Sequence, residues 1–490
     1  MTNEKNSSDI SFVVALMPVL VLLITGALSV FVWKIGMLIP LLSGSTAAAL
    51  VGVYYRKSWD QLETGLKNGV AQALQPIFIL IIVGSIIGSW ILSGIIPSLI
   101  YYGLKIINPS VFLPLAALIT AVVSTSTGTS FTSIATVGIA LMAVGNGMGF
   151  PAAITAAAVI SGAFFGDKIS PLSDTTNIAP AIAECDLFEH INHMFWDTIP
   201  AFLISLVIYY FLGINQMTEI ASGIGEISSL MTGLEGVFNI TPLLLLVPLL
   251  TIILAVKKIP AIPALISVSL VGGLFAVIFQ GASLQQVFSA FSFGYQGNTG
   301  QQMLDSLLNR GGISSMGGTI ILLILATALG GIMREVGILD AILNKFISLI
   351  KNGKQLGVTA IISTFLIGFS TGAQILAIII PGSLFKESYK KFGLHTKNLS
   401  RTVEAAGTVG ITLVPWSVPA IFAANMLEVE AAAFIPYLFF PILVILINVV
   451  YSLTGFSIAE AEVQEDNEIK ILSDAGYSSG CRPSAVKLQL

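Results

Sequence analysis

Long apolar runs separated by short polar segments extend along most of the chain. A helix of about 20 apolar residues crosses a bilayer, and the charge-poor runs give crossings in both halves of the chain. In the first half the expected crossings are 12–33, 37–55, 74–97, 151–166 and 194–213. In the second half they are 240–256, 259–280, 316–336, 402–427 and 433–453. The pattern therefore predicts an all-α polytopic membrane protein with the same number of crossings in each half.

Two further apolar stretches, 111–145 and 357–386, are each interrupted by a polar tip that contains glycine. The tips are STSTGTS at 124–130 and FSTGAQ at 369–374. Each arm has roughly 12–15 residues and rises about 20 Å as a helix, which is less than the ~30 Å hydrocarbon core. Irregular backbone at membrane depth must be lined by protein or by a wet cavity. We therefore expect two re-entrant hairpins whose tips line a site.

A fixed offset in residue number relates the two halves of the sequence. Adding 244 carries a set of residues of the first half onto identical residues of the second half. These residues are Ser126, Thr127, Gly128, Gly166, Pro171 and Ser173, which match Ser370, Thr371, Gly372, Gly410, Pro415 and Ser417. An odd number of crossings in each half requires the second copy to be inverted. We therefore expect two inverted-topology repeats, as in many secondary transporters.

The same pattern divides the chain into segments. They are a cytoplasmic tail at 1–11, a first repeat at 12–213, an external loop at 214–239, a second repeat at 240–454 and a polar cytoplasmic tail at 455–490. The Lys and Arg distribution follows the positive-inside rule if both termini are cytoplasmic. The first eleven residues lack the cationic start of a signal peptide. A multi-pass protein of the cell membrane is expected.

Composition narrows the function classes. Hydrophobic residues make up 55% of the chain and charged residues 10%, against roughly 25% charged residues in an average soluble domain. Soluble enzymes are therefore nearly excluded. A net charge of −4 gives no electrostatic footprint for nucleic acid, and two cysteines are too few for a disulfide framework. No cofactor is expected.

The densest polar cluster of the chain is GDKISPLSDTTN at 166–177. A surface loop is the plain alternative, since Pro and Asp are common at turns. The equivalent segment of the second half, 410–419, is uncharged and must lie at membrane depth, which places its charged counterpart there too. Pro171 and Pro415 each break a helix and free backbone carbonyls to face a cation.

An ionisable residue inside the membrane is a functional-site hypothesis by default, so Asp167 and Asp174 are the leading ion carriers. Na⁺ is a hard cation that prefers oxygen ligands. A buried carboxylate can hold either Na⁺ or a proton, which gives antiport a simple competition mechanism. The predicted site of the first half contains Asp167, Lys168, Ser170, Ser173, Asp174, Thr175, Thr176, Asn177, Ser126 and Thr127. That of the second half contains Ser370, Thr371, Thr412, Ser417 and Glu404.

Two of these residues have plain alternatives. Glu404 begins the broken helix of the second half, where an ion pair with Arg401 is the favoured interpretation. Ser370 lies in 368–372, which matches the G-x-S-x-G nucleophile elbow. That elbow requires a strand, a turn, a helix and a His partner, and the sequence predicts neither the strand nor the His. A transporter is therefore preferred over a hydrolase.

At GAFFGDKISPLSDTTNIAPAIAECDLFEHINHM (162–194), with VVSTSTGTSFTSIATVGIAL upstream (122–141), the sequence resembles the NhaC-type sodium/proton antiporter family. The resemblance covers 10–455 and implies Na⁺/H⁺ exchange by a protein with inverted repeats and paired re-entrant hairpins. It also points to signature positions of the family. In this sequence they are Asp167, Ser170, Asp174, Thr175, Thr176 and Asn177.

Similar proteins also exchange malate and protons for lactate and sodium, so an organic-anion antiporter is the alternative. The core charges Asp167, Lys168, Asp174 and Glu404 sum to a negative balance, which favours a cation. A carboxylate substrate would depend on Lys168. A passive channel, the third possibility, would need a continuous polar stripe along several helices. The expected partners are Na⁺, H⁺ and the lipid bilayer, with malate or lactate and a homodimer left open.

Overall fold

The structure is a computed structural model that describes residues 10–33, 35–106, 108–222, 224–257, 259–299, 304–305, 308–348 and 350–461. Over these residues the chain is helical, with one isolated β-bridge between Leu394 and Glu460. By length and composition, 7 of the described helices could cross a membrane, or up to 10 if each bent pair is one span. The all-α polytopic prediction is confirmed.

Helices α1 to α12 belong to the first half of the chain. They are α1 (Phe12–Ala27), α2 (Leu38–Tyr54), α3 (Trp59–Ala71), α4 (Leu74–Leu92), α5 (Ile95–Ile106), α6 (Pro109–Thr127), α7 (Ser130–Ser133), α8 (Ile139–Gly147), α9 (Ala152–Ile169), α10 (Asp174–Ala183), α11 (Leu187–Ser222) and α12 (Ile224–Val237). A π-helical turn, Ile134–Gly138, joins α7 to α8. The segment 214–239, expected to be a loop, is largely helical because α11 continues into it and α12 follows.

The second half contains the remaining helices. They are α13 (Leu246–Val256), α14 (Ala261–Gln280), α15 (Leu284–Phe293), α17 (Gly317–Val336), α18 (Ile338–Ile347), α19 (Gly353–Thr371), α20 (Gln374–Lys391), α21 (Thr396–Glu404), α22 (Val418–Met426), α23 (Ala431–Phe434) and α24 (Phe439–Thr454). A π-helical turn, Ala405–Val409, and a 3₁₀ turn, Gly410–Leu413, continue α21. The chain then bends by 47° into α22.

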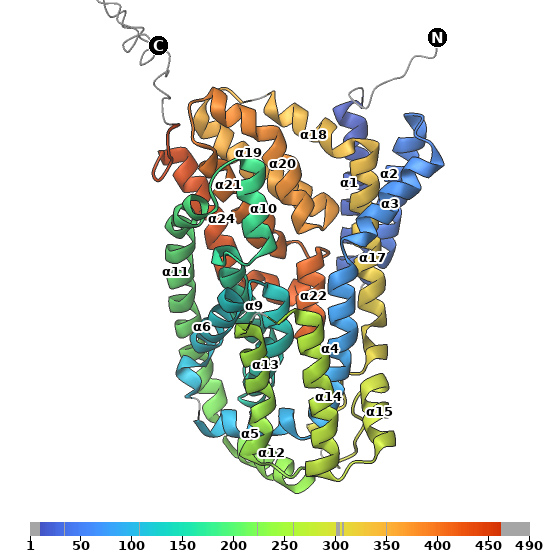
Figure 1. The fold of residues 1–490 in the computed structure, drawn as a ribbon, viewed down its shortest axis with the longest axis vertical. Coiled ribbons are helices and arrows are strands. Elements are labelled where there is room, and N and C mark those ends of the chain that lie inside the picture. The colour runs from blue at the N-terminus through green and yellow to red at the C-terminus, as the bar shows by residue number, and fades with distance from the viewer. Residues whose placement is uncertain are drawn as a thin grey trace, which may run out of the picture.

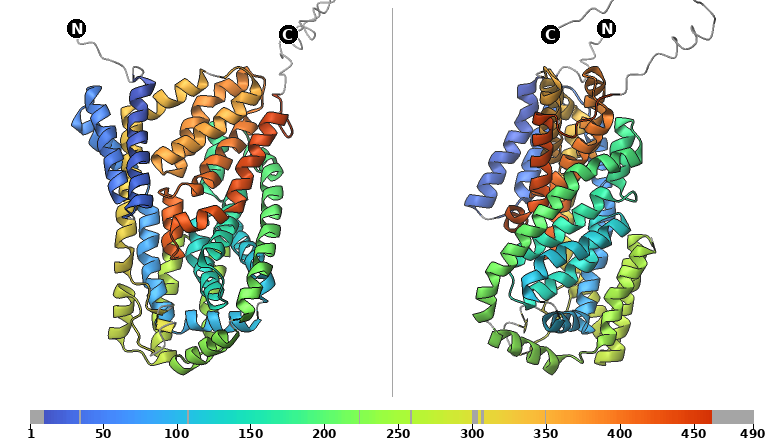
Figure 2. Two further views of the ribbon diagram at one scale, coloured as in Figure 1. Left: turned by 180° about the vertical axis from the view of Figure 1, so that it is seen from behind. Right: turned by 90° about the vertical axis from the view of Figure 1, so that its left-hand side faces the viewer.

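The two hairpins occupy different levels of the molecule. Helices α19 and α20, the arms of the second hairpin, lie in the upper half of Figure 1, whereas α6, the first arm of the other hairpin, lies below them. Helix α11 runs along one side in both figures, and α5 and α12 cover the lower end (Figures 1 and 2). The described chain begins and ends at the upper end. This arrangement brings both hairpin tips toward the middle of the molecule.

The hairpin arms are longer than the sequence predicts. Helices α6 and α19 each have 19 residues and α20 has 18, so each is close to a full span. Gly128 and Gly372 end the first arms with φ angles of +72° and +65°. A residue without Cβ adopts this left-handed conformation at little cost, so both tips turn at glycine.

The same close helix contact occurs twice, each time between a helix of the first half and a helix of the second. A Cβ added at Gly331 of α17 would lie 2.1 Å from the backbone oxygen of Gly65 in α3. A Cβ added at Gly88 of α4 would also lie 2.1 Å from a backbone oxygen, that of Ala290 in α15. Helices α3 and α15 both begin with a serine capping box. This repeated contact supports a duplicated scaffold, while the inverted orientation of the copies stays a prediction.

Candidate functional site

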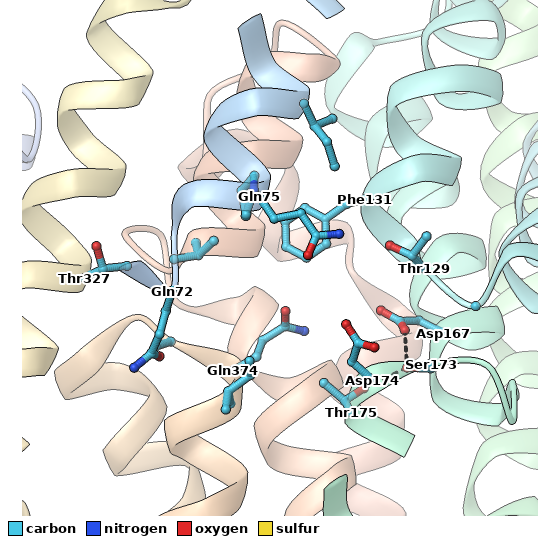
Figure 3. Close-up of a pocket in the computed structure, with 16 residues that line it drawn as sticks. Gln72, Gln75, Thr129, Phe131, Asp167, Ser173, Asp174, Thr175, Thr327 and Gln374 are labelled. Atoms are coloured by element: carbon cyan, nitrogen blue, oxygen red, sulfur yellow. Dashed lines mark hydrogen bonds between the residues drawn. The ribbon is translucent and has the colours of Figure 1, made fainter. Parts of the chain in front are cut away.

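A cavity of about 120 Å³ lies where the hairpin tips and the two broken helices come together (Figure 3). Both halves of the chain contribute to its lining. The polar and tip residues that line it are Gln72, Gln75, Gly128, Thr129, Asp167, Ser173, Asp174, Thr175, Thr327, Ala373 and Gln374. The two hairpin tips therefore meet at this cavity, and of the predicted site residues Asp167, Ser173, Asp174 and Thr175 line it.

The α9–α10 break supplies the carboxylates. Helix α9 ends at Ile169 and α10 begins at Asp174, because Pro171 cannot continue the helix. Thr176 Oγ1 donates hydrogen bonds to the carbonyls of Asp167 and Lys168, at 2.9 and 3.1 Å. These bonds satisfy carbonyls at the end of α9 that the break leaves without helical partners.

Two further polar side chains hold the same break in place. Asn177 Nδ2 donates to the carbonyls of Pro171 and Ser173, at 2.8 and 2.7 Å. Ser170 Oγ donates to the carbonyl of Thr125 in α6, at 2.8 Å. These predicted site residues therefore fix the backbone of the break, and neither is among the residues that line the cavity.

Asp167 is held by hydroxyl groups on both sides. Its Oδ2 accepts a hydrogen bond from Ser130 Oγ at 2.5 Å, and its Oδ1 accepts one from Ser173 Oγ at 2.6 Å. Its side chain is only 6% exposed. Asp174 is the first residue of α10, and its carboxylate points into the cavity (Figure 3). Thr175 Oγ1 lies 3.0 Å from Ser173 Oγ and completes a row of oxygens along one wall.

Amide side chains face these carboxylates from the other helices. Gln374 comes from the second hairpin tip and Gln75 from the start of α4 (Figure 3). Among the described lining residues there are two carboxylates and no Lys, Arg or His. The cavity is therefore negatively charged and rich in oxygen, which suits a small cation.

Lys168 does not contribute to this cavity, although the sequence pattern predicted it there. Its Nζ lies 3.1 and 3.2 Å from the two carboxylate oxygens of Asp197 in α11, and both side chains are fully buried. Neighbouring residues of a helix point in different directions, so Lys168 faces α11 while Asp167 faces the cavity. The ammonium group that a carboxylate substrate would depend on is thus paired with Asp197 in this structure.

Glu404 is fully buried at the start of the π-helical turn of the second half. Neither carboxylate oxygen has a hydrogen-bond partner in the part of the chain that the structure describes. The Thr408 and Thr175 hydroxyls approach it without reaching hydrogen-bond geometry. Arg401 instead donates to the carbonyl and hydroxyl of Ser457, both at 3.0 Å. The interpretation of a Glu404–Arg401 ion pair is therefore wrong.

The remaining predicted hydroxyl groups bond close to their own positions in the chain. Ser126, Thr371 and Thr412 donate to carbonyls of their own helices. Thr127 Oγ1 lies 3.3 Å from the carbonyl oxygen of Ser124. Ser417 caps α22 by accepting from the amide of residue 420 at 3.3 Å. None of these five is among the residues that line the cavity.

Ser370 is buried in the last turn of α19, and its hydroxyl has no partner among the described residues. Helix α19 stands where a nucleophile elbow requires a strand. The geometry that would activate this serine is therefore not present at 368–372.

Several residues at or behind the cavity were missed at the level of sequence. Ser130 ends the first predicted tip, and Gln75 begins the predicted crossing 74–97. Asp197 lies inside the predicted crossing 194–213, where a lone carboxylate is itself a signal of a buried partner. Gln374 is the last residue of the second predicted tip. Each signal is a polar residue at the edge of, or inside, an apolar run.

Comparison with known proteins places this architecture in a family. The family model described as "Na+/H+ antiporter family" matches residues 7–176 and 162–456. A relative named Na⁺/H⁺ antiporter NhaC, from Alkalihalophilus pseudofirmus, is 38% identical over 89% of this chain and 94% of its own length.

Two further relatives carry other names. The malate-2H⁺/Na⁺-lactate antiporter of Bacillus subtilis is 32% identical over 83% of this chain and 87% of its own length. The arginine/ornithine antiporter ArcD of Halobacterium salinarum is 33% identical over 94% of this chain and 95% of its own length. All three relatives match nearly end to end. The chain belongs to the Na⁺/H⁺ antiporter family.

Proposed function

We propose that the protein exchanges Na⁺ for H⁺ across the cell membrane and that the two ions compete for Asp167 and Asp174. The observation that carries this proposal is the charge of the cavity, which two carboxylates line without a Lys, Arg or His among its described lining residues. Uncompensated negative charge at membrane depth is stable only when a cation or a proton occupies the site.

The oxygen atoms of the cavity define a plausible ligand set for Na⁺. The Asp174 carboxylate makes no side-chain hydrogen bond among the described residues, whereas Asp167 is held by Ser130 and Ser173. The hydroxyl groups of Ser173 and Thr175 lie on the same wall. A proton on either carboxylate removes a negative ligand, so proton binding weakens Na⁺ binding and Na⁺ binding expels the proton. That mutual exclusion is the coupling that antiport requires.

The organic-anion alternative receives less support from the fold. A dicarboxylate needs a positive group to offset its charge, and the charge of Lys168 is already neutralised by Asp197. The relatives that exchange malate or arginine nevertheless make both compounds necessary controls in a transport assay.

Liposomes containing the purified protein test the proposal. An imposed pH gradient is monitored with an internal pH-sensitive dye while Na⁺, malate, lactate and arginine are added in turn. We expect Na⁺ alone to dissipate the gradient. Dissipation by malate or arginine, with no response to Na⁺, would replace the proposal.

A matched pair of variants locates the site in the same assay. Asp174→Asn removes a cavity carboxylate and is expected to abolish Na⁺-dependent proton flux. Asp60→Asn removes an exposed carboxylate in the first turn of α3 and is expected to leave the flux unchanged. Near-normal flux in Asp174→Asn protein would exclude Asp174 as a carrier.

We further propose that both termini are cytoplasmic and that the second repeat is inverted relative to the first. Single cysteines at Lys57 and Lys391, in a Cys185→Ala and Cys481→Ala background, should then react with a membrane-impermeant reagent only from inside. A cysteine at Glu226 should react from outside. Outside labelling at Lys391 would contradict the inverted arrangement.

A further inference from the structure

Lys168 and Asp197 form a buried ion pair. Neither side chain is among the residues that line the cavity. Lys168 Nζ contacts both carboxylate oxygens of Asp197, at 3.1 and 3.2 Å. Thr198 Oγ1 donates to Asp197 Oδ1 at 3.0 Å, and Asn448 Nδ2 from α24 donates to Asp197 Oδ2. All four side chains are at most 1% exposed. Each carboxylate oxygen of Asp197 therefore accepts two hydrogen bonds, and these bonds stabilise its ionised form.

The Lys168–Asp197 pair lies close enough to the cavity for its charges to affect a cation bound there. Lys168 directly follows Asp167, whose carboxylate faces the cavity. Glu404 and Arg401 also lie within electrostatic range of Lys168. Fields in a dry protein interior are weakly screened. An unpaired ammonium group at Lys168 would therefore oppose a cation held by Asp167 and Asp174.

We propose that Asp197 is a specificity-determining residue that cancels the charge of Lys168 and so preserves the cation preference of the cavity. Asp197 acts through Lys168 and does not bind Na⁺ itself, so it is a positioning residue. The proposal rests on the proposed Na⁺ site, and it assigns the choice between cation and anion to a side chain outside that site.

The plain alternative is that the pair only holds α9, α11 and α24 together. The two explanations predict different effects of the two single substitutions on Na⁺ binding. Breaking the pair from either side should damage a purely structural contact in the same way. If the pair acts by charge cancellation, the two substitutions have opposite effects on Na⁺ binding. Asp197→Asn leaves a positive charge near the cavity, and Lys168→Gln leaves a negative one.

Na⁺ binding to detergent-solubilised protein distinguishes these explanations, with the Na⁺ concentration at half-maximal thermal stabilisation as the readout. We expect Asp197→Asn to raise this midpoint on the order of tenfold, the effect of a unit charge about one helix diameter away in a protein environment. We expect Lys168→Gln not to raise it. The double variant Lys168→Gln/Asp197→Asn should return within about threefold of wild type.

Asn448→Ala is the matched control, because it removes a hydrogen bond from the same cluster and leaves both charges in place. It should lower thermal stability without moving the Na⁺ midpoint. Equal rises of the midpoint in Asp197→Asn and Lys168→Gln protein, or a double variant as impaired as Asp197→Asn, would overturn the proposal in favour of a structural pair.

A second comparison of variants tests the proposal if Asp197→Asn protein does not fold, and wild-type protein separates this proposal from the proposed function. If Asp197→Asn protein does not fold, the double variant is compared with Lys168→Gln, which should bind Na⁺ more tightly because it retains the Asp197 charge. Equal midpoints in these two proteins would overturn the proposal. Wild-type protein that binds Na⁺ without exchanging it would refute the proposed function and leave this inference standing, whereas wild-type protein that does not bind Na⁺ would refute both.

Discussion

The two broken helices occupy equivalent positions in the two halves but carry different chemistry. In the α9–α10 break, Asp167 is held by two hydroxyl groups and Lys168 by a carboxylate. In the α21–α22 break, the segment Gly410–Ser417 carries no charged side chain. The charge of that half is Glu404, which lies before the break and has no hydrogen-bond partner among the described residues.

The two halves share the contacts that shape the backbone, but they do not share the ionisable side chains. The contacts that shape the fold occur in both halves, since Gly128 packs on Leu172 as Gly372 packs on the backbone of Trp416. The ionisable groups have no such correspondence. One half presents two carboxylates to the cavity, of which Asp167 accepts hydrogen bonds from two hydroxyl groups, and the other half buries Glu404 without a hydrogen-bond partner among the described residues. Each set of groups can be removed separately, which makes the comparison experimentally accessible.

The largest expected effect concerns the charged break. Asp167→Asn should reduce Na⁺-dependent proton flux by about 100-fold or more, because it removes one of two carboxylates of the cavity and replaces an acceptor of two hydroxyl hydrogen bonds. Initial rates in liposomes measure this loss. Ile411→Asn, the change at the equivalent position of the second half, should leave more flux than Asp167→Asn. A lower flux in Ile411→Asn than in Asp167→Asn protein would show that the α21–α22 break, and not the α9–α10 break, carries the ions.

A smaller effect is expected from Glu404→Gln. An ionised carboxylate that is buried without a partner costs more free energy than a neutral amide of the same shape. The variant should therefore be at least as stable to heat as wild type. Because the proposed mechanism places both ions on Asp167 and Asp174, the maximal exchange rate and the apparent Na⁺ affinity should stay within about threefold of wild type. A fall of the maximal rate by about tenfold would instead show that Glu404 carries the exchanged proton.

Local sequence signals predicted the parts of the site that depend on backbone. Pro171 and Pro415 mark the breaks, and Gly128 and Gly372 mark the tips, because a missing N–H or a missing Cβ acts at its own position. The lengths of the hairpin arms were underestimated, since polar residues at the ends of α19 and α20 are compatible with helix when they reach the surface. The placement of α11 and α12 across 214–239 was missed for the same reason.

Side-chain partners were much harder to predict. Lys168 and Asp197 are 29 residues apart, and no spacing rule links residues on two packed helices. Tertiary packing decided which hydroxyl groups reach Asp167. Ser130 donates to its carboxylate, whereas Ser126, in a similar sequence context, donates to the carbonyl of Val122. Pairing across helices follows from tertiary packing and cannot be obtained from periodicity.

The shared scaffold is tested by the glycines. Gly331→Ala and Gly88→Ala each place a methyl group where a Cβ would lie 2.1 Å from a backbone oxygen. Both should lower the free energy of unfolding by about 1–3 kcal/mol, since overpacking forces the backbones apart. Gly317→Ala is the control, because nothing lies within 4 Å of its added Cβ. Thermal unfolding in detergent measures all three, and unequal losses at Gly331 and Gly88 would weaken the case for a duplicated contact.

The smallest expected effect is at the surface between the halves. Glu184 at the end of α10 accepts hydrogen bonds from Lys386 and Lys390 of α20, at 2.8 and 3.0 Å, and these bonds lower its pKa from 4.5 to about 2. Because the folded state holds this proton less tightly than the unfolded state, the stabilisation is present above pH 4.5 and is lost as the pH falls toward 2.

Glu184→Gln should therefore lower the thermal midpoint by no more than a few degrees at pH 7, since the pair is exposed and screened by solvent. The difference from wild type should shrink as the pH falls from 4.5 toward 2. Glu63→Gln serves as the control, because its pair with Lys67 lies within one helix and joins no two parts of the fold. An unchanged thermal midpoint in Glu184→Gln protein at pH 7 would show that the Glu184 contact between α10 and α20 adds nothing to the association of the two halves.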